Sequence, residues 1–352
     1  MENKNRNEQA NEFHLSAEDF LPASSDEKQE TVVMRESISF WKDALQRLVK
    51  RKVTMAAFIA LVIVFVFAFI VPSFYPYTYD QQVRGSENLH PFEYSEQEQA
   101  RIDKGEDVPP HPFGTDALGR DMFIRVMMGT RVSLIVGLVA SFIVLIIGSI
   151  YGSVAGYFGG RVDMVMMRIV DVISTIPDIL IIILLSFALK EPLNKLFASN
   201  SALSGISLLG PSLVSIFITF SLLYWVSMAR IVRGQVMSIK QQEFVTAARA
   251  MGSDPKRVIA RHLLPNSLGT IIVTATLQIP SAIFTESYLS FLGLGVSAPM
   301  PSLGSLASDA LNGITSYTYR LIAPAVVISI IILAFNLFGD GLRDVFDPKL
   351  KK

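Results

Sequence analysis

The sequence of 352 residues contains no cysteine, and histidine and charged residues are scarce. Without cysteine there is no disulfide framework, thiolate zinc site, iron–sulfur cluster or cysteine nucleophile. The four histidines are scattered outside the long apolar segments, so we predict no metal site. The sequence has no Gly-x-x-x-x-Gly-Lys-Ser/Thr phosphate loop, so we expect the chain itself to bind neither ATP nor another cofactor. Basic and acidic side chains balance at 31 each, which gives no argument for a nucleic-acid partner.

Apolar residues, by contrast, make up 51% of the chain. They form six stretches, each near the ~20 residues that cross a hydrocarbon core of about 30 Å. We therefore predict an all-α integral membrane protein with six transmembrane helices that contact membrane lipid. The expected spans lie at about 53–71, 132–155, 169–189, 206–228, 268–289 and 321–338.

The distribution of lysine and arginine predicts the orientation of these spans. Residues 35–52 and 229–267 carry six and seven basic side chains, whereas residues 290–317 carry none. Since basic residues concentrate on the cytoplasmic side, we place both termini in the cytoplasm. The long segment 72–131 then lies outside, where its six basic residues are outnumbered by ten acidic ones.

These boundaries divide the chain into five parts. Residues 1–34, with eight acidic and three basic side chains, are too polar to form a core and are predicted to be a disordered cytoplasmic tail. The other parts are an amphipathic segment with the first transmembrane helix (35–75), an extracytoplasmic loop (76–131), a five-helix core (132–345) with a cytoplasmic loop at 230–266, and a basic tail (346–352).

Small residues and prolines within the spans indicate close packing and bends. Glycine recurs at every fourth position, and this stripe favours packing within the chain over a dimerisation face; it consists of Gly148, Gly152, Gly156 and Gly160. Four prolines in spans three to six are expected to bend their helices, namely Pro177, Pro211, Pro280 and Pro324.

The loop 230–266 contains signals for two short helices. The first ends at Gly252, and the second begins with Asp254 as N-cap and Pro255 as its first residue, and stops at Pro265. Small side chains with an arginine and a methionine beside them form a surface suited to a groove on another protein, namely Ala247, Ala248, Arg249, Met251 and Gly252. The alternative is that the small residues only pack the loop against its own membrane helices.

Ionisable residues within spans are candidates for function. Asp171 and Asp178 are seven residues apart on the third span, so we expect them on one helical face. For Asp171 we favour a partner at the interface, such as Arg168 or water. Asp178 either lines a polar cavity or pairs with a second subunit. Glu286 is associated with an outer gate or with packing of the turn 290–295.

One loop segment resembles a known signature. Ala247-Ala248, three residues, Gly252, nine residues, then His262-Leu263-Leu264-Pro265 is similar to the cytoplasmic signature of permeases of ATP-binding-cassette (ABC) importers. In that family the loop is a coupling helix that docks on the ATPase. Thr246 stands where the family has glutamate, and Glu243, one turn earlier, is a candidate replacement. The residues to which the resemblance assigns ATPase coupling are Glu243, Thr246, Ala247, Ala248, Arg249, Met251, Gly252, Leu264 and Pro265.

Two further blocks resemble the C-type permease subunit of oligopeptide, dipeptide and nickel importers. The first contains Gly114, Thr115, Asp116, Gly119, Arg120 and Asp121; the second, after the fifth span, runs from Glu286 to Gly304. From the residues alone, the first block reads as turns that stabilise a loop; the family implies a docking surface for a binding protein. Candidate residues for the translocation path or its gate are Asp178, Pro280, Glu286, Ser290, Gly293 and Gly295.

The resemblance implies a permease of type I ABC importer fold in a prokaryotic cytoplasmic membrane, and no enzyme activity of its own. Its expected partners are a second homologous permease, two ATPases that hold ATP and Mg²⁺, and an extracytoplasmic solute-binding protein. The expected cargo is an oligopeptide or dipeptide; the alternatives are nickel or another metal chelate, or a proton-coupled secondary transporter.

Overall fold

The computed structural model describes residues 40–199, 210–296 and 298–346, so the predicted tails fall outside the described residues except for Phe346. The chain divides into two units after Leu45. Helix α2 (Phe40–Lys50) crosses that division. The second unit is Gln46–Lys352, and it contains the helices that follow α2.

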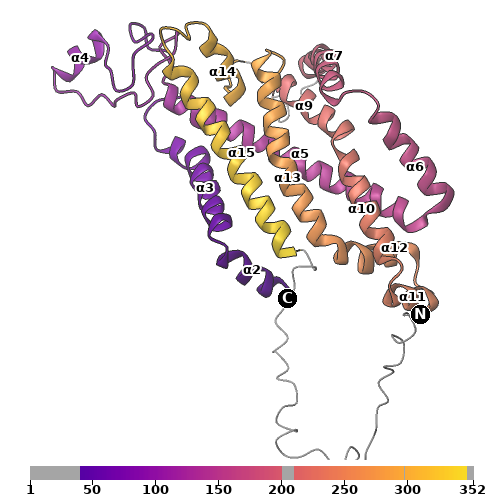
Figure 1. Ribbon diagram of the computed structural model, residues 1–352. Coiled ribbons are helices and arrows are strands. Elements are labelled where there is room, and N and C mark those ends of the chain that lie inside the picture. Colours follow the sequence, from indigo (N-terminus) through magenta and orange to yellow (C-terminus); the bar gives the residue numbers. More distant parts are fainter. Residues whose placement is uncertain (1–39, 200–209, 297, 347–352) are drawn as a thin grey trace, which may run out of the picture. The chain divides into compact units, whose positions relative to one another are not determined.

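This unit is a bundle of helices (Figure 1). In the described ranges, the only β-type pairing is an isolated bridge between Thr115 and Asp121. Five helical runs are long and apolar enough to cross a membrane, and a bent pair makes a sixth if it is counted as one span. The long helices are α3 (Lys52–Phe69), α5 (Met122–Phe158), α6 (Gly160–Ile173), α7 (Asp178–Ser199), α9 (Gly210–Leu223), α10 (Trp225–Ile239), α13 (Leu264–Phe291) and α15 (Tyr319–Phe346).

The predicted third span is broken. Helices α6 and α7 meet at 79°, on either side of a gap that ends at Pro177. Proline has no N–H to donate to the helix before it, and its ring disfavours helical geometry in the preceding residue. The expectation that Asp171 and Asp178 share one helical face is therefore wrong, because the two residues lie on different helices.

The fourth span also differs from its predicted limits. Helix α10 follows α9 directly after Tyr224 and continues to Ile239, well beyond the predicted end at residue 228. Pro211 lies in the first turn of α9, where its missing N–H costs nothing, so it does not bend the middle of the span. Pro280 and Pro324 do lie inside helices, α13 and α15.

Helix α5 has 37 residues and begins ten residues earlier than predicted, capped by Asp121. Three of its predicted glycines face α10. A methyl carbon added to Gly148 would lie 2.5 Å from Met228 Cβ. One added to Gly152 would lie 2.4 Å from Ala229 O, and one added to Gly156 would lie 2.9 Å from Arg233 O. Gly160 is not part of this stripe, since α5 ends at Phe158 and two glycines with positive φ turn the chain into α6.

The two ends of the bundle carry different short elements (Figure 1). At one end lie α4 (Glu96–Ile102) and α14 (Leu303–Leu311), with the short turn Val71–Ser73 after α3. At the other end lie α11 (Glu243–Ala250) and α12 (Pro255–Val258). The predicted stop at Pro265 is wrong: α12 passes through a π-helical turn, Ile259–Leu263, directly into α13. The wider turn lets Leu264 N–H bond to Ile259 O and places Pro265 in a first turn, where proline is tolerated.

Candidate functional site

Helix α11 is fixed to the bundle by one apolar edge. Val245 is fully buried and Ala248 is 3% exposed. Val245 belongs to a hydrophobic cluster with Val236 and Ile239 of α10 and with Val258 and Leu263 of the following turns. A displacement of α11 must therefore move α10 and the start of α13, because their side chains share one core.

The opposite edge of α11 is exposed. Glu243, Thr246, Ala247 and Arg249 face outward, and Met251 is 81% exposed. We call these five residues, with Gly252, the α11 surface. Ala248, expected in this small-residue surface, packs inward instead, because it lies three residues after the buried Val245. Sequence reasoning missed Phe244, which is 40% exposed beside the ring of His262.

The turn after α11 depends on Gly252. Its φ is +80°, and an added methyl carbon would meet nothing within 4 Å, so the backbone angle is what requires glycine. Ser253 N–H donates to Ala248 O at 3.1 Å, which closes the end of the helix. Asp254 takes the N-cap position with extended backbone, but its side chain makes no capping hydrogen bond. Leu264 is half-buried and Pro265 is exposed.

Ion pairs tie α6 to α10 near the same end of the bundle. Arg233 pairs with Asp163, a pair that sequence reasoning did not anticipate. Asp171 pairs with Arg230 Nη2 at 3.1 Å, rather than with the expected Arg168. With the glycine stripe, these contacts join α5, α6 and α10.

Asp178 is exposed at the first position of α7, directly after the break. Tyr224 lies at a second break, between α9 and α10. The hydroxyl of Tyr224 lies 2.6 Å from Thr285 Oγ1 on α13. Asp178 and Tyr224 thus each lie at a helix break, and the Tyr224–Thr285 contact joins α13 to the break between α9 and α10.

Glu286 is fully buried near the end of α13. It accepts hydrogen bonds from Ser133 Oγ of α5 and Ser290 Oγ, each at 2.7 Å. Ser290 Oγ also accepts from Val296 N–H at 3.1 Å, and an added methyl carbon on Gly295 would lie only 1.9 Å from this oxygen. The predicted packing of the turn 290–295 by Glu286 is therefore present, with Gly293 supplying a φ of +77°.

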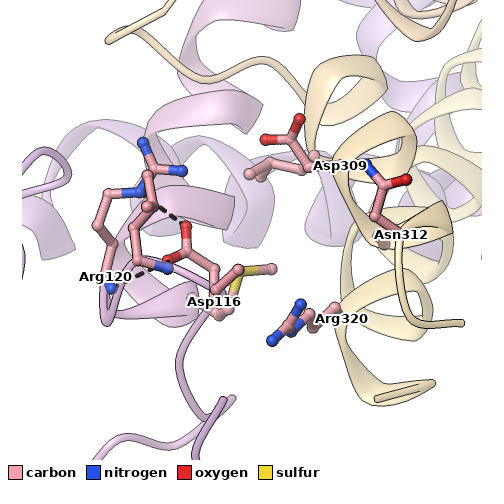
Figure 2. A pocket seen from close by; sticks show the side chains of 10 residues that line it. Asp116, Arg120, Asp309, Asn312 and Arg320 are labelled. Carbon is pink, nitrogen blue, oxygen red and sulfur yellow. Dashed lines mark hydrogen bonds and ion pairs between the residues drawn. The ribbon is translucent and has the colours of Figure 1, made fainter. Parts of the chain in front are cut away.

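The block at residues 114–121 forms tight turns. Gly114 and Gly119 have φ of +70° and +68°, and added methyl carbons would lie 2.2 Å from Leu89 O and 2.1 Å from Val83 O. Asp116 accepts from the N–H groups of Leu118 and Arg120 and from Arg120 Nε at 2.7 Å (Figure 2). The hydrogen bonds of Asp116 are local, whereas the two glycines allow close contact with earlier parts of the same loop, as expected of a segment that fixes a loop.

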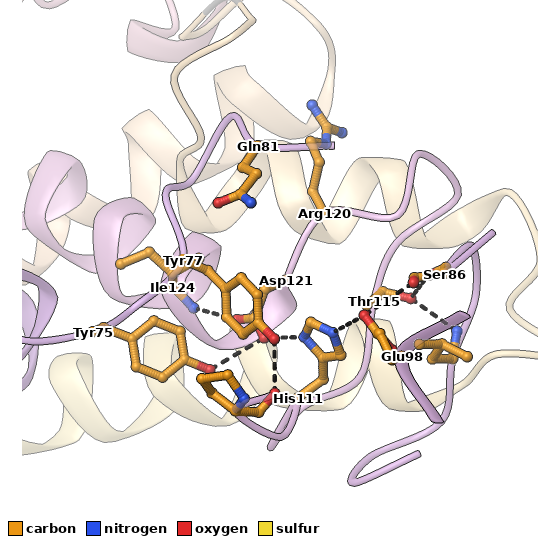
Figure 3. Close-up of polar contacts among 12 residues, drawn as sticks. Tyr75, Tyr77, Gln81, Ser86, Glu98, His111, Thr115, Arg120, Asp121 and Ile124 are labelled. Atoms are coloured by element: carbon orange, nitrogen blue, oxygen red, sulfur yellow. Dashed lines mark hydrogen bonds and ion pairs between the residues drawn. The ribbon is translucent and has the colours of Figure 1, made fainter. Parts of the chain in front are cut away.

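A buried network centres on His111 (Figure 3). Its Nδ1 lies 2.6 Å from Asp121 Oδ2, and its Nε2 lies 3.2 Å from Glu98 Oε1. Tyr75 OH donates to Asp121 at 3.1 Å, and the Tyr77 ring stacks on the imidazole. Thr115 joins the same loop, accepting from Leu89 N–H and donating to Ser86 O. Asp121 thus links the loop to the first turn of α5, where it accepts from Ile124 N–H.

The charges in this network stabilise one another. Burial lowers the pKa of His111, but hydrogen bonds to Asp121 and Glu98 outweigh it and raise this pKa above its ordinary value. Burial raises the pKa of Glu98, yet hydrogen bonds from Ser95 N–H and His111 bring it below its ordinary value. Burial and the neighbouring Asp121 raise the pKa of Tyr75. An imidazolium that donates to both carboxylates accounts for these directions.

Comparison with known proteins places the chain in a family. Residues 145–352 match the family described as "Binding-protein-dependent transport system inner membrane component", and residues 39–91 match "N-terminal TM domain of oligopeptide transport permease C". The chain is 40% identical to the oligopeptide transport system permease protein OppC of Bacillus subtilis (strain 168), covering 95% of this chain and 97% of the relative.

Two further relatives match over similar lengths. Identity is 43% to the dipeptide transport system permease protein DppC of Bacillus subtilis (strain 168), over 91% of this chain and 89% of the relative. It is 37% to the OppC protein of Haemophilus influenzae, over 94% and 95%. From the match over more than half of its length and these relatives, the chain belongs to the family of binding-protein-dependent transport system inner membrane components.

Proposed function

We propose that this chain is a permease subunit of an ABC importer that carries oligopeptides or dipeptides across the cytoplasmic membrane of a prokaryote. The observation that carries the proposal is near full-length similarity to proteins named oligopeptide and dipeptide transport permeases. The role is transport and not catalysis, and the chain itself holds neither ATP nor another cofactor.

The proposed topology counts α6 and α7 as one bent span, which gives six spans and puts both termini in the cytoplasm. The basic loop between α10 and α13 then lies inside, and α4 and α14 lie outside. The placement of α11 and α4 at opposite ends of the bundle supports this assignment (Figure 1).

In this topology the α11 surface is the contact with an ATPase subunit. The exposed Met251 supplies apolar area, and the charges of Glu243 and Arg249 orient the contact. Since Val245 shares a core with α10 and α13, closure of two partner ATPases around ATP and Mg²⁺ is transmitted to the bundle as a rigid-body movement. The α5–α10 glycine contact passes the movement to α5.

We place the translocation path along the face that carries Asp178, shared with a second, homologous permease. An exposed carboxylate within a span needs a polar environment, which a path between two permeases supplies. Pro280 lies within α13, where proline is expected to bend the helix. Glu286, Ser290, Gly293 and Gly295 shape the outer end of the path through the packing of their turn, since Glu286 is buried. The turns at residues 114–121 would face a solute-binding protein.

The α11 assignment can be tested with two matched substitutions. Ala247→Asp places a charge on the α11 surface, and Ala100→Asp places the same charge on an exposed position of α4 at the other end. Both chains are purified from native membranes in mild detergent, and their partners are identified by mass spectrometry. We expect the wild type and Ala100→Asp to retain a phosphate-loop ATPase and Ala247→Asp to lose it. Retention by Ala247→Asp would contradict the assignment.

Substrate choice is tested separately by uptake into cells that lack the chain or express it. We expect a labelled tripeptide or dipeptide to accumulate only when the chain and its partners are present. Uptake of nickel without peptide uptake would replace the peptide with the metal. Peptide uptake that persists after ATP depletion and stops when the proton gradient is removed would instead support a proton-coupled carrier.

A further inference from the structure

A cavity of about 210 Å³ lies between the loop at residues 116–122 and the helices α14 and α15 (Figure 2). It is distinct from the α11 surface and from the face that carries Asp178. Since a water molecule takes up about 30 Å³ of liquid, this space holds a solute the size of an amino acid rather than a single water. Its walls are apolar at Leu118, Met122 and Leu306 and charged at Asp309 and Arg320.

Arg320 is the unusual group in this cavity. It is 5% exposed, yet its Nε and Nη2 have no hydrogen-bond partner among the described residues. The guanidinium stacks on the Tyr317 ring at 4.5 Å, and the Tyr319 phenol approaches it as well. Figure 2 shows Arg320 among the side chains that line the cavity. A buried guanidinium with two unused donors in a fork is suited to a carboxylate.

The nearby carboxylates are already engaged by other arginines. Asp116 pairs with Arg120 Nε at 2.7 Å and with Arg125 Nε at 3.5 Å. Asp309 Oδ2 lies 3.7 Å from Arg125 Nη2. Around the cavity, three guanidinium groups thus face two carboxylates, so one positive charge, that of Arg320, lacks a counterion in the wall.

Asp309 supplies a negative charge in the wall of the same cavity. Its side chain is 64% exposed, so it can still receive a cation from the open side, and Asn312 lies near it on the wall. A ligand that spans from Arg320 to Asp309 therefore carries a carboxylate at one end and an ammonium group at the other. The apolar wall between them suits an aliphatic side chain.

We propose that this cavity binds a small zwitterionic amino acid with an apolar side chain, its carboxylate on Arg320 and its ammonium group on Asp309. Such a site goes beyond the proposed transport function, because it lies outside the proposed path. Occupancy would join α14 and α15 to the turn at residues 116–122, and would make the conformation of this end of the bundle sensitive to free amino acid.

The test is equilibrium binding to the full-length chain in lipid nanodiscs, with labelled L-leucine as the probe. L-leucinamide lacks the carboxylate, and 4-methylpentanoate lacks the ammonium group, so each competitor removes one proposed contact. We expect L-leucine to bind and each competitor to bind about tenfold or more weakly, the effect of losing a buried charge pair. Equal competition by unlabelled L-leucine, L-leucinamide and 4-methylpentanoate would overturn the proposal. So would the absence of L-leucine binding to the wild type.

Substitutions test which side chain makes each proposed contact with the amino acid. Arg320→Gln should weaken L-leucine binding about tenfold or more, with Arg320→Lys intermediate. Asp309→Asn should abolish the preference for L-leucine over 4-methylpentanoate. Arg84→Gln, an exposed arginine of the same loop, is the matched control and should bind as the wild type does. Asp178→Asn should also leave binding unchanged, which separates this site from the path. If Arg320→Gln keeps both its melting temperature and its affinity, the site does not exist.

Discussion

At the scale of single residues, His111 illustrates how one side chain can hold a loop. The imidazolium is placed to donate to Asp121, the N-cap of α5, and to Glu98 on α4, so it connects two elements that the sequence separates. The spacing of these three residues in the sequence does not predict that they are in contact. The glycines of the same block could be predicted, because positive φ leaves few alternatives, whereas a three-residue network depends on how the whole loop folds.

This network predicts a pH window for the loop. The pKa of His111 is raised on folding, so its contribution is complete below its ordinary value of about 6.5 and is lost as pH rises through the folded value. The pKa of Glu98 is lowered, so its contribution is present above about 4.5 and is lost as pH falls through the folded value. We expect amide protection at residues 86–111, measured by hydrogen exchange, to be greatest between these pH values.

Replacement of the imidazole tests the same contact. His111→Gln leaves the two carboxylates without their shared cation and should lower the free energy of unfolding of the loop by about 1–3 kcal/mol. The fall in protection above neutral pH should disappear in this variant. His90→Gln, which changes an exposed histidine of the same loop, is the control and should keep the wild-type profile. A wild-type pH profile in His111→Gln would show that another group controls the loop.

At the scale of elements, the contact of α5 with α10 yields a matched pair of glycine substitutions. Gly152→Ala inserts a methyl group 2.4 Å from Ala229 O, where the backbone cannot yield, and should destabilise the chain by about 1–3 kcal/mol. Gly234→Ala lies inside α10 with no atom within 4 Å, and should be neutral or stabilise by about 0.5–1 kcal/mol. Denaturation of the purified chains in detergent measures both. Equal effects would mean that helix propensity, and not the close contact, governs these sites.

The helices were predictable where composition alone determines them. Apolar stretches gave the existence of the spans, and Asp254, Pro255 and Gly252 gave the ends of the loop helices. The predicted helix ends were wrong where the local backbone geometry determines them. Pro265 does not stop its helix, because a π-helical turn before it accommodates the ring. Pro177 predicted a bend in the third span, but the size of the bend, 79°, was not predictable from the sequence, so Asp171 and Asp178 were wrongly placed on one helical face.

At the scale of the whole molecule, burial separates residues that the motif groups together. The signature in the α11 region predicted a coupling surface, but α11 must also be anchored, and Val245 and Ala248 serve that need. Glu286 also belongs to a motif, but its side chain is buried and hydrogen-bonded to serines of α5 and of its own turn, so it is not available to a partner. A motif therefore indicates which segment matters, whereas the packing decides which of its side chains remain available to a partner.

The orientation of the bundle can be tested directly because the native chain has no cysteine. Lys104→Cys follows α4 and Lys256→Cys lies in α12, and both positions are exposed. In intact cells, or in spheroplasts where an outer membrane is present, a membrane-impermeant maleimide should label Lys104→Cys only. Lys256→Cys should react after permeabilisation, because the basic loop between α10 and α13 is retained in the cytoplasm. The reverse pattern would place α11 outside the cell, where no ATPase could reach it, and would remove the basis for coupling through that helix.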